Sequence, residues 1–237
     1  MSRGSRRMPP EGSRLPALLL VLTGVTGLVD AVSYLKLGHV FVANMTGNVV
    51  FLGFAVAAAE EFSISASLLA LAAFMAGALA GGRISSSAGD HRTRLLAVAT
   101  YLQIALVGAA LLVSMAGLDP EGSLERYSLV ALLALSMGLQ NATVRRLGVP
   151  DLTTTVLTMT LTGLAADSTF AGGKNYHPAR RLQAIGAMFL GAAIGAFLIF
   201  HSGISVVLAV ALALLVLNGI ASFRLDHYPA VIDGEKR

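Results

Sequence analysis

Several apolar windows of about 20 residues constrain this chain most, because a helix of that length spans the hydrocarbon core of a bilayer. Of the 237 residues, 55% are hydrophobic and 13% are charged, whereas a soluble domain carries about 25% charged residues. The mean hydropathy is +0.75. We therefore predict an all-α integral membrane protein whose obligatory partner is the lipid bilayer.

Eight apolar segments delimit the predicted membrane region. They are 15–37, 40–59, 64–84, 95–118, 127–143, 152–166, 182–201 and 204–223. We divide the chain into a basic cytoplasmic tail (1–14), a first membrane repeat (15–118), a second membrane repeat (127–223) and a cytoplasmic tail (224–237). No A-x-A cleavage site closes the first segment early, so we expect a retained signal-anchor helix.

Two segments, 40–59 and 152–166, are interrupted by polar residues. The interrupting residues of the first are Asn44, Thr46, Gly47 and Asn48. Eleven apolar or glycine residues then separate Asn48 from Glu60. As a helix they rise roughly 16 Å, about half of a hydrocarbon core of roughly 30 Å. The second segment has fifteen residues, six of them threonines, and is also too short and polar for an ordinary span.

The distribution of Lys and Arg separates two topologies, because short cytoplasmic loops are enriched in basic residues. If all eight segments cross and the N-terminus is cytoplasmic, six of the 17 basic residues lie outside. If 40–59 and 152–166 instead return to the side they entered, only Lys36 and Arg126 lie outside. We predict six transmembrane helices plus two short re-entrant or broken segments in an inverted repeat; the alternative is eight spanning segments. Both termini then face the cytoplasm, at the cell (cytoplasmic) membrane.

Collinear matches between the halves support a repeat. They are 26–31 (T-G-L-V-D-A) with 137–142 (M-G-L-Q-N-A), 44–47 (N-M-T-G) with 158–161 (T-M-T-L), and 74–81 (F-M-A-G-A-L-A-G) with 189–196 (F-L-G-A-A-I-G-A). The first match pairs Asp30 with Asn141. Three crossings and one half-segment per repeat is a layout of secondary transporters, in which broken helices meet near the membrane midplane.

Three motifs carry a family resemblance: T-G-L-V-D-A at 26–31, F-V-A-N-M-T-G-N at 41–48 and L-T-T-T-V-L-T-M-T-L-T-G at 152–163. Over roughly residues 15–223 the chain resembles the YoaK-like bacterial membrane proteins, domain-of-unknown-function family 1275. The resemblance implies a multi-pass protein of the bacterial inner membrane and names no substrate. Leu161 follows Thr160 where a Thr-Gly pair like Thr46-Gly47 is expected, so the two half-segments are not expected to bind alike.

Asp30 is the acidic residue within the first segment, and intramembrane carboxylates are costly and usually face the bundle interior. We expect it to carry a proton or bind an ion; the alternatives are a hydrogen bond between helices or a cap for the neighbouring broken helix. Asn141 cannot titrate, so any protonation switch is asymmetric. A half-helix that starts near Thr46 would point its N-terminal N–H groups inward, which favours an anion or a carboxylate.

The other candidates for substrate or ion binding are polar residues of the interrupted segments and the repeat mate of Asp30. They are Asn44, Thr46, Gly47, Asn48, Asn141, Thr158, Thr160 and Thr162. Their alternative role is polar packing between helices. Gln103 and Gln140 are expected to form interhelical hydrogen bonds, and Asp167 to be a solvated segment end.

Several function classes lack support. The chain has no cysteine, its five histidines show no metal-ligand spacing, and no nucleotide or hydrolase motif is present. We therefore expect no enzyme activity, no metal and no cofactor. The net charge of +4 follows from topology, so nucleic acid is not an expected partner.

The leading hypothesis is a small secondary transporter or permease for a small solute or ion, with a proton or sodium ion as coupling ion. Its site would lie between the two half-segments, with Asp30 as coupling residue. The alternatives are a passive channel and a non-transporting membrane scaffold or sensor. The sequence leaves a homodimer open.

Overall fold

A computed structural model describes residues 15–57, 59, 61–87, 92–117, 123–149, 157–173 and 177–227, and these residues form no β-strand. The predicted tail at 1–14, the end of the predicted tail at 224–237, and residues 152–156 of the threonine-rich segment lie outside the described residues. The same holds for residues 118–122, at the junction of the two predicted repeats.

Six of the described helices are long and apolar enough to cross a membrane. They are α1 (Leu15–Lys36), α3 (Ile64–Ser87), α4 (Arg92–Met115), α5 (Ser123–Leu147), α7 (Pro178–Ser202) and α8 (Ile204–His227). The other two, α2 (Met45–Val56) and α6 (Leu157–Ala166), have 12 and 10 residues, and are thus about 18 Å and 15 Å long. The prediction of six spans and two short segments is confirmed.

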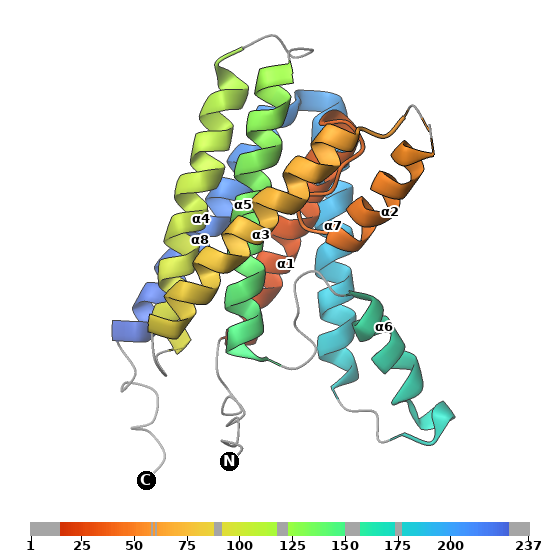
Figure 1. Cartoon of the computed structure of the whole chain (residues 1–237). Helices are drawn as coiled ribbons and strands as arrows, with labels where there is room; N and C mark the ends of the chain where they lie inside the picture. The colour runs from red at the N-terminus through yellow and green to blue at the C-terminus, as the bar shows by residue number, and fades with distance from the viewer. Residues whose placement is uncertain are drawn as a thin grey trace.

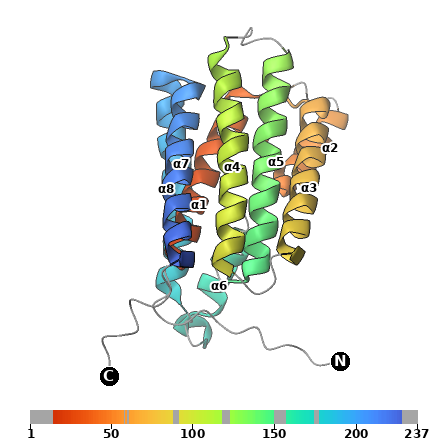
Figure 2. The ribbon, with the colours of Figure 1, turned by 90° about the vertical axis from the view of Figure 1, so that its left-hand side faces the viewer.

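Helices α1 and α5 occupy the centre of the bundle. Their candidate spans are 72% and 61% buried, against 39% or less for the other four. Helix α1 packs against α7 and α8, and α5 packs against α3 and α4. Helices α4 and α8 pack together along one side of the bundle (Figures 1 and 2). The chain thus makes the same helix pairings twice.

Close backbone contact at glycines fixes both pairings. A Cβ on Gly77 of α3 would collide with the carbonyl oxygen of Leu135 on α5. A Cβ on Gly191 of α7 would collide with the carbonyl oxygen of Gly24 on α1. Small residues allow such close approach between membrane helices.

The glycines of the two central helices, α1 and α5, make corresponding contacts as well. A Cβ on Gly27 of α1 would meet the backbone of Met188 and Ala192 on α7. A Cβ on Gly138 of α5 would meet the backbone of Phe74 and Ala78 on α3. The sequence alignment of the halves pairs Gly27 with Gly138, whereas the contacts pair Phe74 of α3 with Met188 of α7, one residue away from the aligned Phe189. The α1–α7 and α5–α3 crossings therefore share one geometry, residue by residue.

Both central helices end at a leucine-glycine pair. Gly38, after α1, has φ of +94°, and Gly148, after α5, has φ of +57°. Left-handed glycines commonly end helices because they lack a Cβ. The preceding Leu37 and Leu147 are buried and anchor the turns.

Each of the two short helices begins at a level between the ends of the bundle, and the two run toward opposite ends. Helix α2 follows a loop from the end of α1 and returns to the end at which α3 begins (Figure 1). Helix α6 leads to the short 3-10 helix η1 (Thr169–Ala171) at the end at which α7 begins. Both lie on the side of the bundle away from α4 and α8. The expected boundaries of the first interrupted segment, 40–59, were too wide, because residues 40–44 are not helical.

Candidate functional site

Asp30 holds the loop that leads into α2. It is 5% exposed, and its Oδ1 accepts hydrogen bonds from the backbone N–H groups of Val42 (3.2 Å) and Ala43 (2.9 Å). A carboxylate also favours the positive end of the α2 dipole, which begins just beyond Ala43. Of the roles expected for Asp30, a cap for the broken helix describes this geometry.

Asn48 clamps the same loop from inside α2. Its Oδ1 accepts from the N–H of Phe41 (2.8 Å), and its Nδ2 donates to the carbonyl oxygen of Phe41 (2.6 Å). Asn44 caps the helix, since its Oδ1 accepts from the N–H of Gly47 at 3.3 Å. Asn48 is fully buried, whereas Asn44 and Thr46 are exposed. Of these four predicted residues, the loop structure uses three, and the Thr46 side chain faces outward.

Six rings surround this loop and form the aromatic cluster. It consists of Tyr34, His39, Phe41, Phe51, Phe54 and Phe62. Tyr34 on α1 stacks on Phe41 at 5.0 Å between centroids, and Phe51 on α2 stacks on Phe62 at 4.8 Å. The cluster joins α1, the loop and α2, with each such pair adding about 0.5–1.5 kcal/mol beyond area burial. Sequence reasoning missed it, although the recurrence of aromatic residues between 34 and 62 was a usable signal.

The second half-helix presents its threonines differently. Thr160 is 3% exposed, while Thr158 and Thr162 are exposed. The Thr162 hydroxyl donates to the carbonyl oxygen of Thr158 at 2.8 Å. Asn141, the repeat mate of Asp30, donates to the carbonyl oxygen of Met137 at 2.9 Å within α5.

Arg181 attaches α6 to α7. It is 7% exposed, and its Nη2 lies 2.7 Å from Oδ2 of Asp167, just after α6. Its guanidinium covers Gly163, where a Cβ would come within 3.0 Å of three guanidinium atoms. Asp167 is half-exposed and ion-paired, not merely solvated as expected. Sequence reasoning missed Arg181 because nothing in the spacing of 163, 167 and 181 signals a shared contact.

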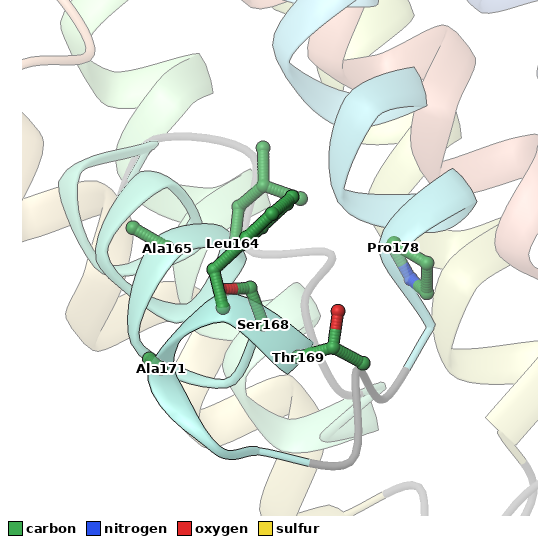
Figure 3. Close-up of a pocket in the computed structure, with 7 residues that line it drawn as sticks. Leu164, Ala165, Ser168, Thr169, Ala171 and Pro178 are labelled. Carbon is green, nitrogen blue, oxygen red and sulfur yellow. The ribbon is translucent and has the colours of Figure 1, made fainter.

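A shallow hollow of about 600 Å³ lies where α6, η1 and the start of α7 meet (Figure 3). Its lining residues are Leu164, Ala165, Ser168, Thr169, Phe170, Ala171 and Pro178. None of the predicted site residues lines it. Its wall is mostly apolar, with Ser168 and Thr169 as the polar members.

The predicted site residues therefore form two groups. Asp30, Asn44, Gly47 and Asn48 come together around the loop before α2, whereas Thr158, Thr160 and Thr162 lie on α6. Helix α2 packs on α3 and α6 packs on α7, and the two do not form a packed pair. In the described part of the chain, no three His, Cys, Asp or Glu side chains could hold a metal ion together.

A polar chain crosses the bundle core apart from both groups. Gln103 on α4 donates to Oε1 of Gln140 on α5 (2.7 Å), and Gln140 donates to Oγ1 of Thr26 on α1 (2.9 Å). All three are buried. The expected interhelical hydrogen bonds of the two glutamines are thus present.

With this geometry in hand, a family model described as protein of unknown function (DUF1275) matches residues 18–220. The chain belongs to the DUF1275 family. The match runs from the first turn of α1 into α8, so the DUF1275 region includes both short helices. The chain is therefore a multi-pass membrane protein of a family whose function is not established.

The DUF1275 chain is also similar to the UPF0700 transmembrane protein YoaK of Bacillus subtilis (strain 168). The two are 35% identical over 150 residues, which cover 63% of this chain and 65% of that protein. The aligned part thus spans just under two thirds of the relative's length. No solved structure matches the chain.

Proposed function

We propose that this chain is a small secondary transporter of the cytoplasmic membrane, built as an inverted repeat with both termini in the cytoplasm. The observation that supports this proposal most is the residue-by-residue equivalence of the α1–α7 and α5–α3 crossings. A half-helix lies beside each crossing. Inverted repeats with discontinuous helices are typical of secondary transporters. The described basic residues support the orientation: Lys36 and Arg126 lie at one end of the bundle, and the other eight lie at the opposite end.

Asp30 is the proposed coupling residue. As a carboxylate it binds the N–H groups of Val42 and Ala43 through one oxygen. Protonation removes the charge and weakens both bonds, because hydrogen bonds to an ionised acceptor are roughly twice as strong as neutral ones. The loop then loosens, and α2, which continues from it, changes position against α3. A proton or sodium ion at Asp30 is in this way linked to the access of a polar solute to the half-helices.

The experiment uses the purified chain in liposomes that contain a pH-sensitive dye, with a panel of amino acids, carboxylates, sugars and amines added outside. We expect at least one solute to accumulate under a proton or sodium gradient, and the Asp30→Asn variant to lose gradient dependence. Solute flux that is independent of both the proton and the sodium gradient would indicate a channel. Correctly folded protein that moves no solute of the panel would count against transport.

A further inference from the structure

Helices α2 and α6 form one side of the molecule and lie outside the six spanning helices. Both are on the side remote from α4 and α8 (Figure 1). In the described residues, α2 is supported by α3 and the aromatic cluster, and α6 by α7. We name the outer surface of α2 and α6 the half-helix face.

Polar groups of this face lie within the membrane. Asp30, which holds the loop before α2, is six residues from the end of α1, a depth of roughly 9 Å along the helix. Asn44 and Thr46 are exposed at this level, and Thr158 and Thr162 are exposed on α6. Asn44 and Thr162 each make one hydrogen bond within the chain. Lipid offers none to the remaining amide and hydroxyl groups, so protein or a water-filled cavity must cover them.

The chemistry of the face suits a second copy of the same chain. Neither α2 nor α6 contains a charged residue. Asparagine and threonine side chains both donate and accept, so each can pair with its own equivalent. A two-fold axis along the membrane normal brings together residues that lie at the same depth in the two copies. It therefore sets α2 against the partner's α2 and α6 against the partner's α6.

Gly53 is a second sign that something approaches this face. It lies within α2, is exposed, and has no atom within 4 Å of the position of a Cβ. Glycine weakens a helix interior, and no contact among the described residues requires it here. In membrane helices such small residues let a neighbouring backbone approach. Six residues of α2 and six of α6 are exposed, and a stable interface of roughly 20–30 residues per side also needs adjoining parts of α3 and α7.

We propose that the half-helix face is a homodimer interface, and that the solute site is incomplete until the half-helices of two copies meet. The partner covers the exposed ends of α2 and α6 and encloses the polar residues beside them. This inference rests on the proposed transport function for the site, but the contact itself can be tested without transport.

Cross-linking tests the contact directly, because the chain has no native cysteine. Single cysteines replace Val49 or Gly53 on α2 and Leu161 on α6, and in control variants Leu112 on α4 or Leu217 on α8. The three replaced leucines and Val49 are 51–70% exposed. In native membranes we expect a cross-linked dimer from the α2 or α6 variants and none from the controls. A dimer from α4 or α8 alone, or a product with a different protein, would overturn the proposal.

A bulky substitution tests whether the site needs the partner. A Cβ on Gly53 has no atom of the described residues within 4 Å and the position is exposed, so we expect the Gly53→Trp monomer to fold as before. We expect about a tenfold loss of dimer, because a large ring is forced into close packing, and an equal loss of transport. Leu112→Trp on α4 should change neither. A monomeric Gly53→Trp variant with full transport would overturn this inference alone. A dimer that transports no solute would count against the proposed function and leave the contact standing.

Discussion

Removing the Asp30 carboxylate should destabilise the protein in a graded way. Its Oδ1 accepts two buried backbone donors, at 3.2 Å and 2.9 Å. Each unsatisfied buried donor costs about 1–3 kcal/mol. Because one of the two bonds is long, we expect Asp30→Ala to lower the free energy of unfolding by roughly 2–4 kcal/mol.

Asp30→Asn should cost less, because the amide oxygen can accept from the same two N–H groups. Only the charge contribution is lost, which is about half of each bond, and we expect a loss of roughly 1–2 kcal/mol.

The assay is thermal unfolding in mild detergent, followed by size-exclusion chromatography of a fluorescent fusion. The expected order of stability is the wild type, then Asp30→Asn, then Asp30→Ala. Equal stability of the Ala variant and the wild type would refute the capping role. Equal loss in both variants would show that the charge, and not the acceptor, holds the loop.

Two further predictions concern packing and the polar core. Gly77→Leu and Gly191→Leu should each reduce the yield of folded protein severely and to a similar extent, because both place a side chain against the backbone of a central helix. The control is Gly82→Leu, where a Cβ meets no atom within 4 Å. Unequal losses in the first two variants would contradict the equivalence of the two crossings. Gln103→Leu and Gln140→Leu should each cost about 1–2 kcal/mol in the same assay, and the double variant less than their sum, because it leaves no orphaned partner.

Much of the architecture could be predicted from two properties of the sequence. Hydropathy gave the spanning segments, and the Lys and Arg distribution gave the half-segments, because both depend on local composition and bilayer thickness. The small residues of the aligned stretches 74–81 and 189–196 also indicated where helices approach closely. Such signals are local or periodic, and they can therefore be recognised in the sequence without knowledge of the fold.

The candidate site was less predictable because its contacts join distant residues. Nothing in the sequence pairs Asp30 with the backbone of Val42, since a backbone N–H donor leaves no pattern of residue types. The contact of Arg181 with Gly163 depends on how α6 lies on α7. The expectation that the half-helices meet within one chain also came from analogy; in this structure α2 and α6 each pack on a neighbouring long helix.

The most direct test of the account is the side of the membrane on which each helix end lies. Single cysteines at Glu61, Ser87, Ala171 and Ser202, all exposed, are labelled on intact cells with a membrane-impermeant maleimide. In the proposed arrangement α2 returns to the side it entered, so positions 61 and 202 should react, and positions 87 and 171 should react only after permeabilisation. Reaction at 87 and protection at 61 would mean that the α2 segment crosses the membrane, and would contradict the inverted half-helix arrangement.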